Sequence, residues 1–413
     1  MEYLLPANNL YGNAPVPISF PDDWEVHVCS YAGEKAPALS PEEIAQRLSQ
    51  PGTGGCRTIA EDARGSRNAV IIFDDITRPT PCEAIAKAVI VQLEEAGIPR
   101  REIRFVCALG GHRGMGRQEF VRKLGEDIVR EFEIYNHNPF FNNVKVGDSA
   151  YGYPVELNSL CVSADYTVGI GALFPHPPTG VGGGPKLILP GIASAETIRG
   201  FHTGGTTGQW DLECDGRKKA VEATRMLGLR VKIDVLLNGR GEIAQVYYGD
   251  ADENTRAHID EIHQFFLCHS AGTADLVISN NYFKPSESSN AILPGTRAYD
   301  MVRDGGDVVL SSHTPLGTAQ HYMFGWWGGG GGLMYKPKSV PPHIRRHFAF
   351  YSYPDHGTDI GWQPRGENVL FRSKWADILA ELGTAPRKVI ILPYALVNWF
   401  DPPVPRHGES AVR

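Results

Sequence analysis

The first half of the chain alternates short apolar runs with longer amphipathic segments. Apolar runs occupy 68–73 (NAVIIF), 102–109 (EIRFVCAL) and 165–173 (DYTVGIGAL), and each of them enters a loop. Runs of this length are typical of strands that are buried on both faces. Because helical patterns follow the first two runs, we predict a parallel sheet with helices on its faces.

A helix start is predicted shortly after the first run. Thr80 fits the N-cap, Pro81 fits the first helical position, and Glu83 completes a T-x-x-E capping box. The helical pattern ends before the Gly-Ile-Pro at 97–99. A second helix is predicted over 117–133 (RQEFVRKLGEDIVREFE).

The remainder of the first half differs in pattern. Residues 231–250 contain two alternating runs around Asn-Gly-Arg-Gly at 238–241, which predicts an antiparallel hairpin. An amphipathic stretch over 253–270 follows the hairpin.

The second half returns to short apolar runs that each enter a loop. They occupy 274–280, 307–313, 347–353 and 388–394. We therefore expect an α/β fold of two domains, 1–271 and 272–413, each with a wound, mainly parallel sheet flanked by helices. In such sheets ligands bind at the carboxyl ends of strands, so we predict an active site in the cleft between the domains.

Composition narrows the class of protein. The 413 residues exceed what one hydrophobic core usually serves, and the net charge of -7 argues against attraction to nucleic acid or to anionic membranes. No apolar run is long enough to cross a membrane, and the N-terminus lacks a signal-peptide pattern. The seven cysteines include no C-x-x-C pair, which favours a reducing cytoplasm.

Two loops carry unusual polar chemistry at predicted strand ends. DDITRPTP at 74–81 places Asp74, Asp75, Thr77 and Arg78 before a helix N-terminus, which attracts phosphate or carboxylate. Loop capping by either aspartate is the alternative. GGHRGMG at 110–116 places His112 beside an arginine among four glycines; a structural histidine is the alternative.

A third loop, at 174–202, is richer still. His176 follows the predicted strand, Gly182 to Gly184 allow close approach of a ligand, and Lys186 comes next. The P-loop pattern is absent because Leu187 stands where Ser or Thr belongs. A lysine here can bind phosphate or act as a covalent nucleophile.

A short helix is predicted over SAETIRGFH, and it carries His202. A neutral imidazole there can bind nickel or zinc, with the other ligands coming from elsewhere in the chain or from a cofactor.

Together the three motifs resemble the nickel-dependent lactate racemases. The resemblance rests on DDITRPTP, on GGHRGM and on H-x9-K-x15-H with GGGPKLILPGIASAETI inside it, and it covers most of residues 60–205. It implies a nickel-pincer nucleotide, pyridinium-3-thioamide-5-thiocarboxylic acid mononucleotide, attached covalently to Lys186. It also implies that His202 completes the coordination of nickel.

The resemblance further implies roles for the other motif residues. His112 and His176 match an acid–base pair on opposite faces of the substrate, and Arg78 matches an arginine that orients the substrate carboxylate. Asp75, Thr77, Gly183 and Gly184 are expected to hold the cofactor. The implied activity is a racemase or epimerase that inverts C2 of a 2-hydroxy acid by reversible hydride transfer, matured by cofactor biosynthesis enzymes.

The second domain departs from the family pattern. Lactate-specific members typically carry Tyr-Gln-x-x-Lys, whereas SNNYFKPSESSNAILPG stands at 279–295. Tyr282 and Lys284 are the predicted substrate contacts, and the cluster favours an acid larger or more polar than lactate; an N-capping loop is the alternative. Residues 313–332, with Trp326 and Trp327, are a candidate flap over the cleft, and core packing of a tryptophan is its alternative.

Two other functions stay open from sequence. One is a conventional nucleotide-dependent 2-hydroxy-acid dehydrogenase. This class of enzyme needs a G-x-G-x-x-G turn after the first strand, and the absence of glycine from DDITRPTP argues against it. The other is a non-catalytic carrier or binding protein of the same fold. Such a protein does not need the catalytic set, so the presence of all its members argues against this function; they are Lys186, His202, His112 and His176.

Overall fold

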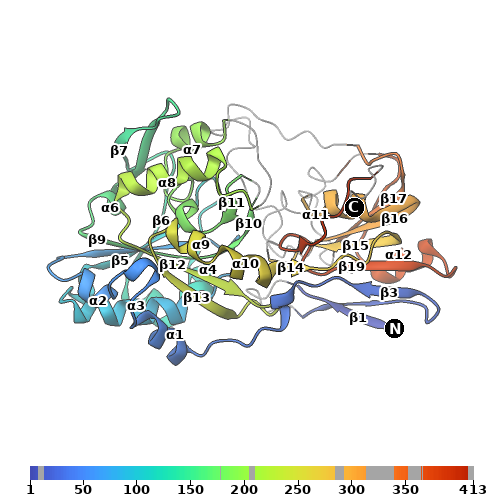
Figure 1. Cartoon of the computed structure of the whole chain (residues 1–413), viewed down its shortest axis with the longest axis horizontal. Helices are drawn as coiled ribbons and strands as arrows, with labels where there is room; N and C mark the ends of the chain where they lie inside the picture. The colour runs from blue at the N-terminus through green and yellow to red at the C-terminus, as the bar shows by residue number, and fades with distance from the viewer. Residues whose placement is uncertain are drawn as a thin grey trace. The chain divides into compact units, whose positions relative to one another are not determined.

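The structure is a computed structural model that describes residues 1–7, 14–176, 178–203, 210–283, 293–312, 339–351, 364 and 366–407 (Figure 1). These residues separate into two compact units. The central unit comprises residues 36–262, and the terminal unit comprises residues 1–35 together with those from 263 onward. Each unit contains one six-stranded sheet.

The sheet of the central unit has the order β13-β12-β9-β4-β5-β6. Its strands are β4 (Ala69–Asp74), β5 (Ile103–Ala108), β6 (Glu133–Asn136), β9 (Tyr166–Ala172), β12 (Val231–Leu237) and β13 (Ile243–Gly249). All neighbours are parallel except β12 and β13, which form the predicted hairpin. Every residue of β4, β9 and β12 is buried, which explains their continuous apolar runs.

Helices cover both faces of this sheet. Figure 1 shows α1 (Pro41–Leu48), α2 (Ile59–Asp62) and α3 (Glu83–Glu95) on one side, and α7 (Ala195–Phe201) and α8 (Asp215–Leu227) on the other. On the second side, Val70 and Ile72 of β4 belong to a buried core that also contains Leu187 and Ile188. The chain on the C-terminal side of Lys186 is therefore anchored in the core.

The predicted start of the helix at Thr80 is wrong. The helix α3 begins at Glu83, and Cys82 occupies the N-cap position without a side-chain capping bond. The Thr80 hydroxyl instead donates to the buried Asp74 Oδ2 at 2.6 Å, a charge-assisted hydrogen bond that holds Thr80 away from the start of the helix.

The predicted helix at 117–133 is also divided. It forms α4 (Arg117–Leu124) and α5 (Glu126–Glu131), and its last residue begins β6, which the sequence analysis missed. Gly125 separates the two helices with φ of 82°. With its ψ of 157°, this is a backbone conformation that residues with a Cβ rarely adopt, so the position requires glycine.

The sheet of the terminal unit is parallel throughout, in the order β18-β17-β16-β15-β19-β3. Its strands are β3 (Glu25–Val28), β15 (Ala274–Asn280), β16 (Val302–Ser312), β17 (Ile344–Tyr351), β18 (Val369–Arg372) and β19 (Lys388–Leu392). The four predicted strands of the second half are present. The expectation that residues 1–35 join the first domain is wrong, because β3 pairs with β19 at the edge of this sheet.

The remaining elements are short. The strands are β1 (Glu2–Leu5), β2 (Val16–Ser19), β7 (Asn143–Asp148), β8 (Pro154–Asn158), β10 (Phe174–His176), β11 (Gly180–Gly182), β14 (Leu267–Cys268) and β20 (Trp399–Phe400). The helices are α6 (Ser159–Val162), α9 (Glu253–Ala257), α10 (Ile259–Phe266), α11 (Leu293–Met301) and α12 (Trp375–Leu382). Single 3-10 turns are η2 (Ala32–Lys35), η3 (Thr53–Gly55), η4 (Arg100–Glu102) and η5 (Gly184–Leu187).

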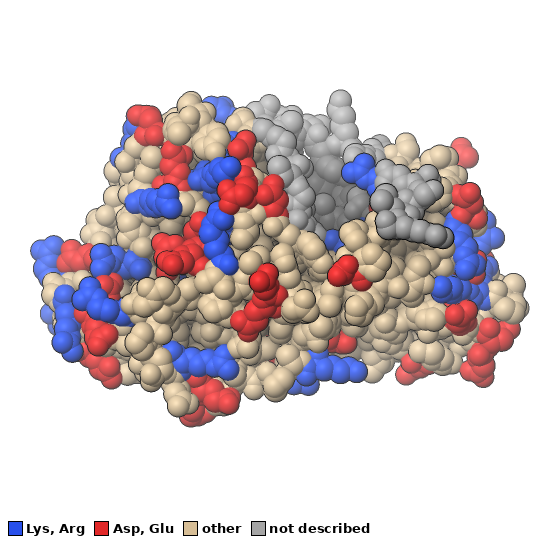
Figure 2. Space-filling model, viewed as in Figure 1, with Lys and Arg blue, Asp and Glu red and all other residues tan. Residues whose placement is uncertain are grey.

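The surface charge is mixed in sign. On the face that Figure 2 shows, Lys and Arg side chains lie among Asp and Glu side chains, without a wide area of one sign. Within the described ranges, no helix combines the length and the apolar character that a membrane crossing requires.

Candidate active site

Three loops leave the same edge of the central sheet. Because β4, β5 and β9 are parallel neighbours, their carboxyl ends lie together. The loop after β4 carries Asp75, Thr77 and Arg78, the loop after β5 carries His112, and the chain after β9 carries His176. The predicted catalytic residues of the first domain thus start from one edge, as expected for ligand sites in parallel sheets.

Asp75 joins the first two loops. Its Oδ2 lies 2.6 Å from His112 Nδ1, and its Oδ1 accepts from the Thr77 hydroxyl at 2.5 Å. Arg78 Nη1 donates in turn to Thr77 Oγ1 at 2.7 Å. Asp75 is buried, which alone would raise the pKa of its carboxyl, but His112, Arg78 and Thr77 outweigh burial and lower that pKa. An ionised carboxylate only accepts, so His112 donates Nδ1–H and carries its lone pair on Nε2.

His176 is supported by a hydroxyl rather than a carboxylate. It ends β10, which forms a hairpin with β11 and pairs His176 with Gly180. Buried Thr179 lies in the turn, with its Oγ1 3.0 Å from His176 Nδ1. The same hydroxyl donates to Val181 O at 3.1 Å, so it accepts from Nδ1–H. His176 therefore carries its lone pair on Nε2 as well.

Lys186 lies in η5, directly after a glycine loop that has no room for side chains. A Cβ at Gly183 would lie 2.5 Å from Ala172 O, and one at Gly184 would lie 2.7 Å from Ala251 O. Both glycines have positive φ, 81° and 52°. Asp234 Oδ1 accepts from Gly184 N at 3.0 Å and fixes the loop. Lys186 is partly buried.

His202 ends α7, the short helix that the sequence predicted. Ser194 caps its start by accepting from Thr197 N. His202 Nδ1 lies 2.8 Å from Ile198 O, so Nδ1 carries the proton and Nε2 carries the lone pair. His202 is exposed among the described residues, yet the protein atoms packed around its ring lower its pKa to about 4. The nearby charges of Lys186 and Lys219 add to this lowering.

Beneath these loops lies a charged floor of four buried residues, Asp74, Lys123, Lys232 and Asp234. Lys123 Nζ pairs with Asp74 and also donates to Arg78 O at 3.0 Å. Lys232 Nζ pairs with Asp234 Oδ1 at 2.5 Å. Burial would lower the pKa of Lys123, but Asp74 outweighs it and raises that pKa. The floor holds Arg78 and the glycine loop in place.

Of these four residues, only Asp74 was predicted from the sequence, although a signal for Lys232 and Asp234 was present. In VKIDVLL, two opposite charges stand two residues apart in a strand that is otherwise apolar. Side chains two apart share one face of a strand, so a buried strand of this kind needs an internal ion pair. Gly169 and Gly171 of β9 leave the space, since a Cβ at Gly169 would lie 2.8 Å from Lys232 Cδ.

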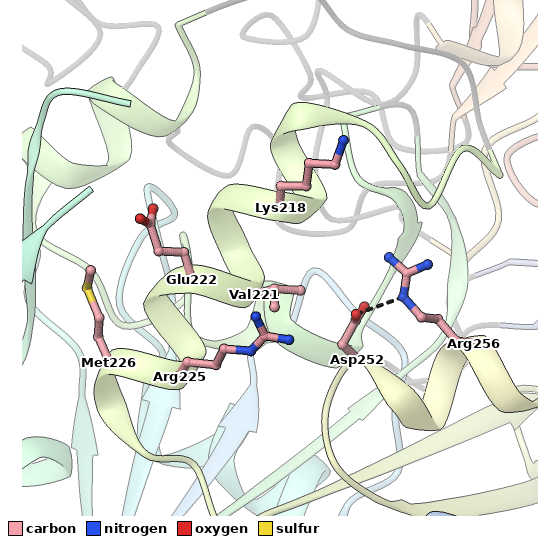
Figure 3. A pocket seen from close by; sticks show the side chains of 7 residues that line it. All are labelled: Lys218, Val221, Glu222, Arg225, Met226, Asp252 and Arg256. Atoms are coloured by element: carbon pink, nitrogen blue, oxygen red, sulfur yellow. Dashed lines mark hydrogen bonds and ion pairs between the residues drawn. The ribbon is translucent and has the colours of Figure 1, made fainter. Parts of the chain in front are cut away.

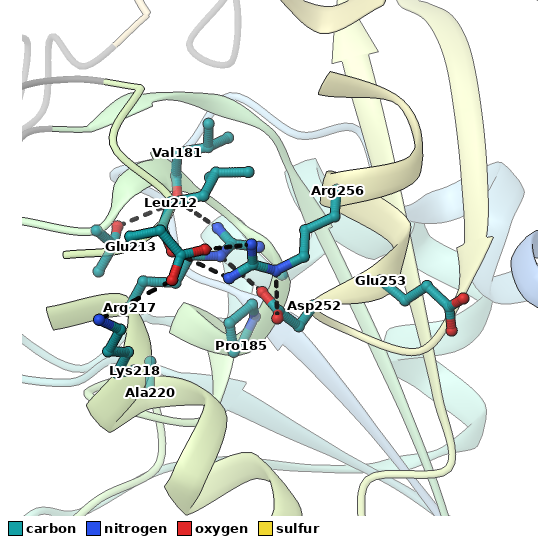
Figure 4. A network of polar contacts seen from close by, with 12 residues as sticks. Val181, Pro185, Leu212, Glu213, Arg217, Lys218, Ala220, Asp252, Glu253 and Arg256 are labelled. Carbon is teal, nitrogen blue, oxygen red and sulfur yellow. Dashed lines mark hydrogen bonds and ion pairs between the residues drawn. The ribbon is translucent and has the colours of Figure 1, made fainter. Parts of the chain in front are cut away.

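Helix α8, which the sequence analysis did not predict, braces the chain on either side of Lys186. Figure 4 shows Arg217 of α8 and Arg256 of α9 meeting at Asp252, with Nε–Oδ distances of 2.7 and 2.8 Å. Arg217 Nη1 reaches Val181 O at 3.4 Å, and Thr224 Oγ1 donates to Pro185 O at 3.3 Å. These contacts tie the glycine loop to α8.

A surface groove beside α8 is separate from the predicted site. Its lining includes Lys218, Glu222, Arg225 and Arg256, as Figure 3 shows. None of the residues predicted from sequence lines it. Its cations and carboxylates are of the kind that an exposed helix face carries.

The remaining predicted residues belong to the second half. Tyr282 is 3% exposed, in an aromatic cluster with Tyr31, Phe283 and Tyr394, and its contact with substrate stays a prediction. Lys284 and the candidate flap at 313–332, with its two tryptophans, lie outside the described residues. In the part of the chain that the structure describes, no three His, Cys, Asp or Glu side chains gather to hold a metal ion.

Comparisons with known proteins point to one family. The family described as lactate racemase N-terminal domain matches residues 11–213. Lactate racemase of Thermoanaerobacterium thermosaccharolyticum is 26% identical over 332 residues, which are 77% of this chain and 76% of that protein. Lactate racemase of Lactiplantibacillus plantarum is 30% identical over 280 residues, 65% of each chain.

Solved structures agree on the fold. The lactate racemase apoprotein of T. thermosaccharolyticum matches with a TM-score of 0.69 and 20% identity, covering 97% of this chain and all of that one. A Thermotoga maritima protein matches with a TM-score of 0.63 and 18% identity, covering 90% of this chain and 99% of that one. Residues 11–213 thus match the lactate racemase N-terminal domain, and the chain is similar in sequence to lactate racemases and shares the fold of the solved apoprotein.

Proposed function

We propose that this protein is an isomerase that inverts C2 of a 2-hydroxy acid by reversible hydride transfer. Homology to lactate racemases supports a racemase in general. The finer proposal adds a nickel-pincer nucleotide attached covalently to Lys186, with His202 as the protein's nickel ligand. The observation that carries it is that the charges of Lys186 and His112 both act on His202, while His112 contacts Asp75. Lys186 also follows glycines whose surroundings have no room for side chains.

The residues present fit this cofactor. His202 holds its proton on Nδ1 through Ile198 O, which is the usual way that proteins orient a metal-binding imidazole. Its lowered pKa keeps the ring neutral at pH 7, as a ligand must be. Gly183 and Gly184 pack against Ala172 O and Ala251 O, which fixes the backbone that leads into Lys186. When bound, the group supplies an electron-poor ring that accepts and returns hydride.

The chain's own residues supply binding and proton transfer. Arg78 binds the substrate carboxylate, a role for which a guanidinium is suited because it stays charged and binds in a bidentate way. His112 or His176 takes the hydroxyl proton at Nε2 while the C2 hydrogen leaves as hydride. The 2-keto acid that remains is planar, so hydride returns to either face and a histidine gives back the proton.

The proposed substrate is larger or more polar than lactate. The departure from Tyr-Gln-x-x-Lys after β15 supports this, with Tyr282 and Lys284 as proposed contacts. Rates measured on lactate, malate, 2-hydroxyglutarate and sugar acids check it, and fastest turnover of lactate would contradict it. The proposal also includes maturation by cofactor biosynthesis enzymes. The proposed location is the cytoplasm, which the seven free cysteines support because thiols stay reduced there.

The deciding experiment is co-expression with the cofactor-making enzymes, followed by intact mass and nickel content. We expect a nucleotide-sized mass increase with stoichiometric nickel in the wild type. Lys186→Ala should lose both, and His202→Ala should keep the adduct and lose nickel. Lys87→Ala, an exposed lysine of α3, is the matched control and should load normally.

Two other results would favour a different function for this protein. If the wild type gains neither adduct nor nickel while a known lactate racemase loads normally, the proposal fails and a binding protein of the same fold takes its place. Turnover of a 2-hydroxy acid that depends on added NAD would instead favour the dehydrogenase.

A further inference from the structure

We infer that Lys219 is a positioning residue for the proposed nickel ligand. From α8 it holds the C-terminal end of α7 and so determines where His202 presents Nε2. The inference rests on the proposed function, because it concerns the ligand that the proposed cofactor needs.

The Lys219 ammonium is directed at the end of α7. The side chain is 4% exposed. Its Nζ donates to Thr203 O at 2.6 Å, to Phe201 O at 3.3 Å and to Gly200 O at 3.4 Å. These carbonyls belong to the residues before and after His202 in the chain. An ammonium has three N–H donors, so its whole donor capacity serves this helix end.

The contacts meet a physical need of α7. The last carbonyls of a helix have no partner inside it and carry the negative end of the helix dipole. A buried cation placed there satisfies several carbonyls at once. A glycine in αL is a common alternative, but here the C-cap is His202 itself, at φ -85° and ψ 1°. The ligand's own backbone therefore depends on a side chain from another helix.

Two tyrosines close the space around Lys219 and α7. The Nζ atom lies 5.0 Å from the ring centre of Tyr151 and 5.9 Å from that of Tyr153, in cation–π geometry. Gly200 packs against Tyr153 so closely that a Cβ there would lie 2.3 Å from the ring. The end of α7 thus has no freedom to move toward this ring.

The test compares Lys219→Met with Lys218→Met on the full-length, cofactor-loaded protein. Lys218 is the preceding residue of α8, but its side chain is exposed and its Nζ lies 3.9 Å from Glu213 Oε2. It is therefore a matched control. We expect Lys219→Met to keep the adduct on Lys186 and to lose nickel affinity about 10–100-fold, as changes behind metal ligands do. Lys218→Met should bind nickel as the wild type does.

A second readout needs no cofactor. The side-chain 15N shifts of His202 in the apoprotein, at one pH, report which nitrogen carries the proton. We expect the Nδ1–H form in the wild type and in Lys218→Met, and a mixture of both forms in Lys219→Met. Lys219→Gln, which drops the charge but keeps an N–H donor, replaces Lys219→Met if circular dichroism shows that the latter does not fold.

The outcomes are separable. Wild-type nickel affinity and an unchanged His202 spectrum in the Lys219 variant would overturn the positioning role. Absence of adduct and nickel in the wild type would overturn the proposed function instead. Loss of the adduct itself in Lys219→Met would also overturn the inference, because it would mean that Lys219 supports Lys186 rather than His202.

Discussion

The two proposed bases, His112 and His176, hold their imidazole rings by the same nitrogen but by different partners. His112 Nδ1 faces the buried carboxylate of Asp75 at 2.6 Å, and His176 Nδ1 faces the buried hydroxyl of Thr179 at 3.0 Å. Both arrangements leave Nε2 as the basic nitrogen. Only the carboxylate adds a negative charge, which stabilises the imidazolium once the proton has been taken.

The difference shows that fixing a tautomer and stabilising a charge are separate tasks. Two enantiomers have equal free energy, so a racemase must have the same kcat/KM in both directions, however unlike its bases are. The asymmetry therefore concerns the individual proton-transfer steps, because only the His112 ring has a carboxylate against it. For an epimerase, whose two substrates differ in free energy, the ratio of the two kcat/KM values equals the equilibrium constant, so the unlike bases leave that ratio unchanged as well.

The largest expected effect comes from removing the charge behind His112. Asp75→Asn should lower kcat by about 10²–10⁴-fold, because the amide does not stabilise the imidazolium and can also select the wrong tautomer. Turnover of both enantiomers by the loaded enzyme measures it. The variant must first show wild-type adduct and nickel. A loss below tenfold would show that the Asp75 carboxylate does not stabilise the His112 imidazolium during turnover.

A third histidine provides a reference without a proposed proton-transfer role. His137 is buried, with Nε2 2.8 Å from Ala193 O and Nδ1 3.2 Å from Asn158 Nδ2, and burial lowers its pKa to about 4. The folded state binds fewer protons than the unfolded state between the two pKa values. The contribution of neutral His137 to the free energy of unfolding is thus complete above about pH 6.5 and is lost as the pH falls toward 4.

The loss amounts to about 3 kcal/mol for this one histidine. Urea unfolding at pH 7.5 and at pH 4.5 should show a smaller decrease in the free energy of unfolding for His137→Gln than for the wild type. Equal decreases in the two proteins would mean that His137 does not stay neutral in the folded state.

The smallest expected effect concerns the hydroxyl behind His176. Thr179→Val removes the neutral hydrogen bond to His176, worth about 1 kcal/mol, together with the one to Val181 O, and should lower kcat about fivefold to tenfold. Thr179→Ser keeps the hydroxyl and should restore the rate. If the valine variant lost as much as Asp75→Asn, the two supports would be equivalent and the contrast between the bases would disappear.

The sequence predicted the loops of the site better than their supports. Strands buried on both faces and loops with His112, His176, Lys186 and His202 were recognisable because they have local patterns. Lys219 was missed because its partners are backbone carbonyls of another helix, which leave no mark in a sequence.

Competition and edge pairing explain two further errors. The T-x-x-E pattern at Thr80 failed because the hydroxyl bonds to Asp74, a partner six residues away that local capping rules ignore. Residues 25–28 were not predicted as a strand, since a short edge strand with exposed polar side chains has little apolar signal. How residues 284–292 bear on substrate choice stays a prediction.

The charged floor limits how this protein can be redesigned. Its two lysines and two aspartates sum to no net charge, and Gly169 and Gly171 leave space for the lysine stem and nothing larger. Replacing any one of the four by a neutral residue leaves its partner as a buried charge without an opposite charge beside it. An engineer who wants a different loop above the floor must exchange a cation and an anion together, or leave all four untouched.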